Sequence, residues 1–279
     1  MDIWQADFYR RPLRDANGQV LWELLICNVT GSLIYSSLCP QTLANSSWLT
    51  SQLQQAARGR GLPQQIQVFR PQSLHLLNLA APELGIQVEA TRHTPALKQL
   101  LQERAAQYSQ QDNYTGEAYQ PLALDKPPPV PLPENLWGEQ WRFAILPAGN
   151  LEEAFAERPI PILQMPEFLL PINLGIASTI PVPGVIIDGG RQSMRLARWL
   201  EEVQPVSLNY IKGSPDGLIL EAGLVERWVV ATFEDQEVAT AAERFQQRKQ
   251  QSLGLHFLLV QPDDSGMTYS GFWLLRENE

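Results

Sequence analysis

A proline-rich segment at residues 121–133 sets the strongest limit on how this chain can fold. Its sequence is PLALDKPPPVPLP, in which six of thirteen residues are proline. Proline fixes φ and lacks an amide hydrogen, so the segment is extended and semi-rigid rather than helical or part of a central strand. The chain has 279 residues, which is enough for two domains. The sequence therefore predicts an N-terminal α/β domain at 1–120, a linker at 121–133 and a C-terminal α/β domain at 134–279.

The N-terminal domain begins with three segments of strand character and continues with alternating helices and strands. The run VLWELLICN at 20–28 is almost entirely apolar, which suits a central strand covered on both faces. Helix starts and stops are marked by Ser, Pro and Gly residues. We expect strands at 3–10, 20–28, 32–38, 65–69 and 86–90, and helices at 46–59, 71–85 and 94–107. This element order resembles the ribonuclease H-like topology, with a mixed sheet, and the fold class is α/β (α+β).

The C-terminal domain also mixes strands and helices. We expect strands at 141–148, 184–188, 205–211, 218–221 and 227–233, helices at 191–202 and 234–251, and a last hairpin that includes 271–277. Short stretches match the N-terminal domain at a constant offset of 120, for example VFRPQS at 68–73 and DGGRQS at 188–193. Two hypotheses fit these matches: the domains arose by duplication, or they are two unrelated α/β lobes.

Charge is distributed unevenly along the chain, whose formal net charge is −9. Residues 1–120 hold nine Lys/Arg and nine Asp/Glu, whereas 121–279 hold twelve and twenty-one. Net negative charge repels nucleic acid, so any RNA would have to bind a local cationic patch, and the neutral N-terminal domain is the more permissive surface. The N-terminal sequence MDIWQADFYRR has no signal-peptide character, and no apolar run is long enough to span a membrane.

Cysteine and histidine usage argues against a zinc site. The three histidines lie in different segments, so no ligand spacing can be assembled, and we expect them to be structural or solvated. Cys27 and Cys39 favour buried thiols, with a single disulfide as the alternative. We expect neither a metal nor another cofactor.

Carboxylates in the first strands raise the question of a metal nuclease, because ribonuclease H-like nucleases hold metal ions with several carboxylates. Asp7 and Glu23 lie on strands that we expect to be neighbours, and Glu89 ends a later strand. A two-metal site needs three or four converging carboxylates, and a late helix-borne Asp is not evident. The alternative is that Asp7 and Glu23 pair with Arg10, Arg11 or Arg14.

Two basic groups are candidate RNA contacts. Near the N-terminus, Arg10, Arg11 and Arg14 accompany the aromatic residues Trp4, Phe8 and Tyr9, a combination that binds single-stranded RNA through stacking and phosphate pairing. On strand periodicity some of these aromatics must face the core.

The second group follows VIIDGG at 185–190, a strand-to-helix turn that either holds an anion or requires a positive φ at Gly189 or Gly190. Arg191, Arg195 and Arg198 share one face of the next helix. That face either contacts phosphates or is simply solvated.

Several stretches together resemble the Tab2/Atab2 family of photosystem translation factors. They are DFYRRPL at 7–13, VLWELLIC at 20–27, FRPQ at 69–72, ELGIQVEATRHTPAL at 83–97, GLHFLLVQ at 254–261 and GFWLLRE at 271–277. The family hallmark is a Trp-Leu-Leu tripeptide near the C-terminus, here Trp273, Leu274 and Leu275.

The resemblance implies a non-enzymatic RNA-binding factor. Plastid members support translation of messages for photosystem reaction-centre proteins, notably the photosystem I B subunit, and related proteins occur in cyanobacteria. Because the chain shows no transit peptide, the resemblance implies a cyanobacterial cytoplasmic protein whose partners are such messages, translation or assembly proteins, and no membrane. Two alternatives stay open: a protein–protein adaptor in photosystem assembly, and a divergent ribonuclease H-like nuclease.

The tripeptide itself lies in the last predicted strand, which pairs with 255–260. Alternation sends Trp273 and Leu275 to one face and Phe272 and Leu274 to the other. Both faces are therefore large and apolar, which predicts a buried strand. The alternative is an exposed Trp273 that stacks on a base or a partner.

Overall fold

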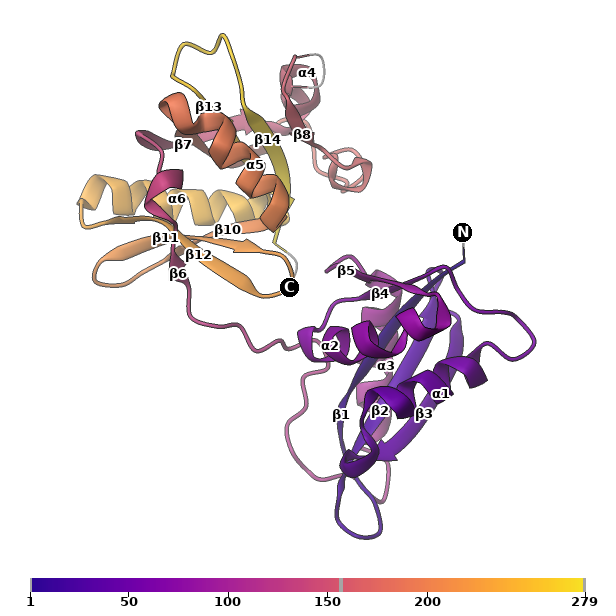
Figure 1. Cartoon of the computed structure of the whole chain (residues 1–279). Coiled ribbons are helices and arrows are strands. Elements are labelled where there is room, and N and C mark those ends of the chain that lie inside the picture. The colour runs from indigo at the N-terminus through magenta and orange to yellow at the C-terminus, as the bar shows by residue number, and fades with distance from the viewer. Residues whose placement is uncertain (1, 156–157, 278–279) are drawn as a thin grey trace. The chain divides into compact units, whose positions relative to one another are not determined.

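Figure 1 shows a computed structural model, described here for residues 2–155 and 158–277. The chain divides into unit 1, Met1–Asp125, and unit 2, Lys126–Glu279, so the boundary lies inside the proline-rich segment. Both ends of this segment are packed: Leu122 and Leu124 lie against the core of unit 1, and Val130–Pro131 forms a short strand in unit 2. The free part of the linker is therefore shorter than the predicted 121–133.

Unit 1 contains one five-stranded mixed sheet in the order β3-β2-β1-β4-β5. Its strands are β1 (Ile3–Arg14), β2 (Val20–Asn28), β3 (Leu33–Pro40), β4 (Gln65–Val68) and β5 (Gln87–Ala90). The first three strands are antiparallel neighbours, whereas β4 runs parallel to β1 and β5 parallel to β4. The predicted ribonuclease H-like element order is confirmed.

Helices cover both faces of this sheet (Figure 1). They are α1 (Ser46–Ala56), α2 (Pro71–Ala80) and α3 (Pro95–Tyr108), with short 3-10 turns η1 (Gln41–Leu43) and η2 (Pro82–Leu84). The β1 side chains Trp4, Ala6 and Phe8 belong to the core beneath α1 and α2, while Leu25 and Cys27 of β2 pack with α3. Because both of its faces are buried, β2 has a nearly continuous apolar sequence.

Unit 2 contains two sheets among its described residues. The five-stranded sheet has the order β7-β9-β13-β14-β8 and the four-stranded sheet the order β10-β11-β12-β6. Strands of the first are β7 (Gln140–Pro147), β8 (Ile162–Gln164), β9 (Pro181–Asp188), β13 (Leu255–Gln261) and β14 (Gly271–Arg276). Strands of the second are β6 (Val130–Pro131), β10 (Pro205–Ile211), β11 (Asp216–Ala222) and β12 (Glu226–Phe233).

The helices of unit 2 complete two separate cores. They are α4 (Leu151–Phe155), α5 (Ser193–Val203) and α6 (Gln236–Gln251), with 3-10 turns η3 (Glu134–Leu136), η4 (Ala148–Asn150), η5 (Glu167–Leu169) and η6 (Gly190–Gln192). One core joins α5 and α6 to side chains from both sheets, and the other joins α4 to the opposite face of the five-stranded sheet. Among the described residues, no helix is long and apolar enough to cross a membrane.

The two units differ in topology, which argues against the duplication hypothesis. In unit 1, β4 and β5 are adjacent in one sheet. Their counterparts at the offset of 120, β9 and β10, lie in different sheets of unit 2. Both matched hexapeptides connect a strand to a helical segment, so their similarity reflects this local connection rather than a common arrangement of strands in the sheets.

The Trp-Leu-Leu strand is buried, as predicted. Trp273, Leu274 and Leu275 are only 2–3% exposed, and β14 lies between β13 and β8. Trp273 and Leu275 belong to the core beneath α5 and α6, whereas Phe272 and Leu274 belong to the core beneath α4. The alternation predicted from the sequence is confirmed, and the tripeptide joins the two cores of unit 2.

Candidate functional site

Asp7 is the centre of a buried charge network in unit 1. Asp7 lies on β1, next to the carboxyl end of the neighbouring strand β4. Arg70 follows β4 and directly precedes helix α2. Arg70 Nε donates to Asp7 Oδ1 over 2.9 Å, Ser73 Oγ donates to the same oxygen over 2.9 Å, and Arg11 Nη2 donates to Oδ2 over 3.0 Å. Asp7 is fully buried, and all of these partners are buried with it.

Glu23, which lies opposite Tyr9 on the neighbouring strand β2, takes part in the same network. Arg11 Nε donates to Glu23 Oε2 over 3.0 Å, so one guanidinium bridges the two carboxylates. The Tyr108 hydroxyl also donates to Glu23, and Arg104 lies 3.5 Å from its other oxygen. Arg11 Nη1 donates to the Tyr119 hydroxyl. The hypothesis of ion pairing is confirmed for Arg11, while Arg14 pairs instead with Glu117, at 3.7 Å.

The electrostatics of the network follow from burial and pairing. Burial by itself would raise the pKa of Asp7, but Arg70, Arg11 and the Ser73 hydroxyl hold that pKa below its ordinary value. Burial and the neighbouring Glu23 raise the pKa of Tyr108, so this phenol stays protonated as a donor. The guanidinium groups of Arg11, Arg70 and Arg104 thus pair with the two carboxylates, which argues against a metal ion held between them.

Two residues predicted as RNA contacts, Phe8 and Arg11, are buried inside the fold. Phe8 is fully buried under α1 and stacks on Trp48, and Arg11 is 2% exposed in the charge network. Both predictions are corrected, because β1 is covered on both faces. Arg10 and Arg14 are exposed, and Tyr9 is half-buried with the Arg70 guanidinium 4.1 Å from its ring centre.

The arginines of the second group lie on the surface of unit 2. Arg191 is in η6, and Arg195 and Arg198 are on α5, all three exposed, while Ala197 and Leu200 face the core. Gly190 has φ of 52°, so the predicted positive φ is confirmed there. The amides of Gly189 and Gly190 donate to the carbonyls of Gln261 and Pro262. Both amides are therefore occupied, which argues against an anion site in this turn.

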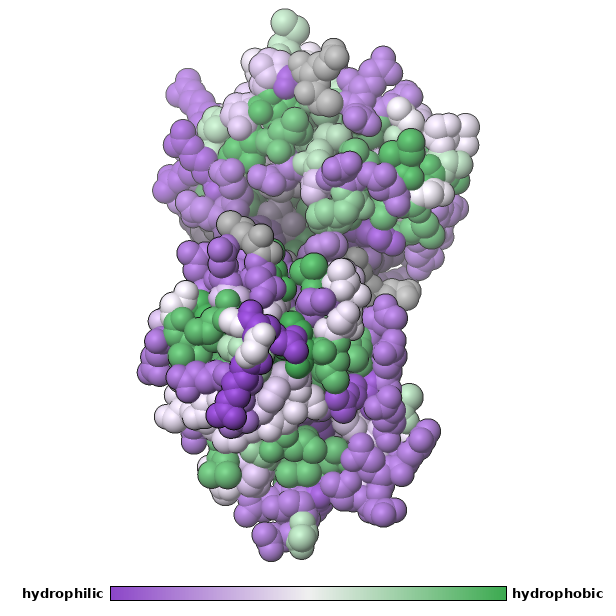
Figure 2. Space-filling view, turned by 90° about the vertical axis from the view of Figure 1, so that its right-hand side faces the viewer, coloured by the Kyte–Doolittle hydropathy of each residue, from purple (hydrophilic) through white to green (hydrophobic). Residues whose placement is uncertain are grey.

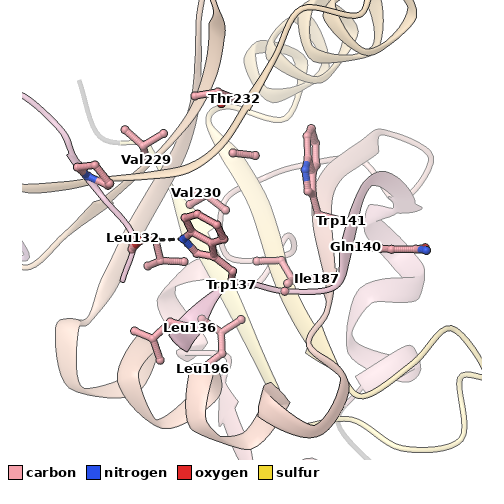
Figure 3. Close-up of a pocket in the computed structure, with 13 residues that line it drawn as sticks. Leu132, Leu136, Trp137, Gln140, Trp141, Ile187, Leu196, Val229, Val230 and Thr232 are labelled. Carbon is pink, nitrogen blue, oxygen red and sulfur yellow. Dashed lines mark hydrogen bonds between the residues drawn. The ribbon is translucent and has the colours of Figure 1, made fainter. Parts of the chain in front are cut away.

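An apolar pocket in unit 2 was not predicted from the sequence. On the side of the molecule seen in Figure 2, hydrophobic side chains reach the surface in patches between hydrophilic ones, and Trp137 is an exposed hydrophobic side chain at 56%. Its indole borders a pocket of about 540 Å³ between β12 and β7. In the view of Figure 3, Val229, Val230 and Thr232 lie above the Trp137 ring, Trp141 lies to its right, and Leu136 and Leu196 lie below it. Trp137 Nε1 donates to the Leu132 carbonyl, which holds the ring in place.

Comparison with known families identifies the lineage of the chain. A model described as the N-terminal part of the RNA-binding protein Tab2/Atab2 matches residues 3–104, and a model of its C-terminal domain matches residues 119–276. The chain belongs to the Tab2/Atab2 family. Its two matched regions correspond to units 1 and 2, and the segment between them ends just before the proline-rich boundary.

Known Tab2 relatives align along almost the whole chain. The chloroplastic TAB2 homologue of Arabidopsis thaliana is 32% identical over 98% of this chain and 74% of the plant protein. The chloroplastic homologue of Zea mays is 31% identical over 98% of this chain and 70% of that protein. A simian T-cell lymphotropic virus intasome in complex with a PP2A regulatory subunit matches with a TM-score of 0.30 at 12% identity, over 52% of this chain and 62% of the viral-complex chain, which is too weak to carry an argument.

Sequence reasoning on this Tab2-family chain missed two features for identifiable reasons. Nothing in the sequence indicated that Arg70, part of the stretch FRPQ, forms an ion pair with Asp7, because the two residues are 63 positions apart. Trp137 follows the proline-rich segment, where no periodicity marks a strand or helix. The sequence signal that could have drawn attention to the pocket is a tryptophan soon after a proline-rich segment, where it has no strand or helix pattern to bury it.

Proposed function

We propose that this Tab2-family chain is a non-enzymatic RNA-binding factor, of cyanobacterial type, that supports translation or biogenesis of photosystem I reaction-centre subunits. Photosystem II subunits are a second candidate set. The observation that carries the proposal is the match of both family models, each described as part of an RNA-binding protein, to residues 3–104 and 119–276. The relatives named above are chloroplastic, which supports a role in photosynthetic cells.

The geometry supports two surface groups as phosphate contacts. Arg10 and Arg14 are exposed on β1 of unit 1, and the Arg10 guanidinium lies 5.8 Å from the ring centre of the half-buried Tyr9. The exposed residues Arg191, Arg195 and Arg198, which we call the arginine stripe, belong to η6 and α5 of unit 2. Because RNA affinity depends on local cation–phosphate contacts, such a stripe can act even on a chain of net charge −9.

A charge-matched variant set tests this proposal. The double variant Arg191→Gln/Arg195→Gln removes two exposed positive charges from the stripe of unit 2. The control Arg58→Gln/Arg60→Gln removes two exposed charges near the end of α1. Both variants change net charge equally, so a difference between them reports a local site rather than overall repulsion.

The readout is the affinity for single-stranded photosystem leader RNA at several salt concentrations. We expect the stripe variant to bind more weakly and to lower the slope of log affinity against log salt by about 1 for each lost phosphate contact, with the control unchanged. Equal losses in both variants would contradict the assignment of the stripe. Absent or salt-insensitive RNA binding by the unmodified chain would contradict the RNA-binding proposal and favour the adaptor.

A further inference from the structure

The pocket beside Trp137 is apolar, and none of the described residues that line it is charged. Trp137 and Trp141 supply aromatic surface, and Leu136, Ile187 and Leu196 form much of the rest. Gln140 and Thr232 are the polar side chains of the lining. The volume of about 540 Å³ lies within the range of roughly 300–1,000 Å³ that is typical of ligand pockets. An apolar side chain fits such a lining, whereas a phosphate would find no cation in it.

One wall of the pocket is the edge of a β-sheet. Strand β12 has eight residues, but β6 pairs only with Trp228 and Val229 on this edge. The next residues, Val230–Thr232, line the pocket instead. An edge strand presents backbone donors and acceptors that can pair with an added strand. Among the described residues, none pairs with β12 beyond Val229 on this edge. The backbone of Val230–Thr232 can therefore pair with a second extended segment that continues the line of β6.

Strand β6 shows what kind of segment this edge accepts. It is the extended pair Val130–Pro131, it runs parallel to β12, and the following Leu132 amide donates to the Val229 carbonyl. An added segment would continue this established pairing along β12. Peptide recognition by strand addition works in this way, with backbone hydrogen bonds for affinity and a pocket for a side chain.

Acidic residues adjoin the pocket lining in the sequence, and we call Glu134, Glu139, Glu234 and Asp235 the acidic rim. Glu134 and Glu139 are exposed on either side of Trp137 in the chain, and Glu234 and Asp235 are exposed directly after β12. Asp235 also caps α6 by accepting from the amides of Glu237 and Val238. Arg142, the nearest basic residue along β7, is paired with Asp188. These charges attract lysine and arginine and repel phosphate.

From the open strand edge, the apolar lining and the acidic rim together, we propose that unit 2 docks an extended peptide segment of a partner protein. The segment pairs with β12 beyond β6, inserts an apolar side chain beside Trp137 and Trp141, and carries lysine or arginine on its flanks. This docking site has no residue in common with the arginine stripe proposed for RNA, although Leu196 of α5 lines the pocket.

The test uses the full chain and three labelled probes. The first is the peptide KKVTVLVKK, the second is its counterpart EEVTVLVEE with the same apolar centre, and the third is a twelve-residue oligouridylate. Fluorescence anisotropy measures binding, and amide hydrogen exchange measures protection of the 230–232 segment. We expect the basic-flanked peptide to bind at least ten-fold more tightly than the acidic-flanked one and to slow exchange at 230–232.

Variants assign the binding to the pocket. Trp137→Ala removes the exposed ring, and Ala231→Trp fills the space, so each should weaken binding of the basic-flanked peptide at least ten-fold. Ile172→Ala, which truncates an 80% exposed apolar side chain outside the pocket, is the matched control and should change nothing. Circular dichroism of each variant verifies folding.

Three results would overturn the proposal. Equal affinity for the two peptides would remove the role of the acidic rim. Undiminished peptide binding in both pocket variants would place the peptide elsewhere. If the oligouridylate bound in a Trp137-dependent way and the peptides did not, the pocket would be a base-stacking site. None of these outcomes depends on whether the arginine stripe binds RNA.

Discussion

Replacing Trp273 by alanine tests whether the family tripeptide is a core element or an RNA contact. The side chain is 2% exposed in the core beneath α5 and α6, and its indole lies over Gly271, where a β-carbon would overlap the ring. Burial of a large aromatic side chain removes about 150–250 Å² from water. At about 25 cal/mol per Å² this corresponds to roughly 4–6 kcal/mol. Alanine retains a small part of that area, so we expect Trp273→Ala to lower the free energy of unfolding by about 3–5 kcal/mol.

The matched control is Trp273→Phe. Among the described residues, Trp273 Nε1 has no hydrogen-bond partner although it is buried. Phenylalanine keeps most of the packing and removes this unpaired donor, so we expect a loss of about 1 kcal/mol or less.

The assay is urea unfolding of the full chain, followed by hydrogen exchange of peptides from unit 2, because two units can unfold in separate steps. An RNA titration of the same variants accompanies it under conditions where each is folded. We expect folded Trp273→Ala to keep its RNA affinity. If stability were unchanged while RNA binding collapsed, Trp273 would be a contact residue and the assignment to the core would be wrong.

Four further predictions follow from buried groups. Arg70→Met leaves the Asp7 carboxylate buried with one partner fewer and should destabilise unit 1 by about 3–5 kcal/mol, with partial recovery in Arg70→Met/Asp7→Asn, measured by hydrogen exchange. Burial lowers the pKa of His256 to about 3, so on acidification from about pH 6.5 the unfolded chain takes up a proton that the folded chain does not. The free energy of unfolding should then fall by about 1.4 kcal/mol per pH unit from this group, a slope that should be absent in His256→Asn. Burial raises the pKa values of Cys27 and Cys39 to about 11, so iodoacetamide should label both thiols slowly in the native chain and rapidly in urea, as mass spectrometry will show. The recombinant chain should not cleave single-stranded RNA with Mg²⁺ or Mn²⁺, and divalent-dependent cleavage that disappears in Asp7→Asn would contradict the structural role of the network.

Local patterns predicted the elements of both units well where periodicity was strong. The apolar run at 20–28 predicted a central strand, and it is β2, covered by helices on both faces. The alternation in GFWLLR predicted which side chains share a face, because in a strand successive side chains point to opposite sides. The helix 94–107 was placed within one residue of α3, since Thr-Pro marks a helix start.

The candidate site was predicted less well, because exposure depends on what covers a strand. Phe8 and Arg11 stand in a sequence that combines cations and aromatics, which is a pattern of RNA contacts, yet both are buried. Strand β1 is covered by α1 and by the end of α3 that carries Tyr108. Both helices lie far from β1 in the sequence, so the residues around Phe8 and Arg11 give no sign of this cover. Arg191, Arg195 and Arg198 are all exposed, but only Arg195 and Arg198 lie on α5, because this helix begins at Ser193 and Arg191 belongs to the preceding turn η6.

The sequence by itself determined the two-unit organisation, most strands and helices, the element order of unit 1 and the buried tripeptide strand. Each of these depends on residues close together in the chain: turn formers, caps, and apolar spacing of two or 3.6 residues. Tertiary structure alone decided that β9 and β10 separate into different sheets, that Arg70 neutralises Asp7, and that Trp137 borders a pocket at an open strand edge. These features depend on contacts between residues that are tens of positions apart in the chain. A local pattern cannot predict such contacts, because the same strand and helix periodicity is compatible with many different tertiary folds.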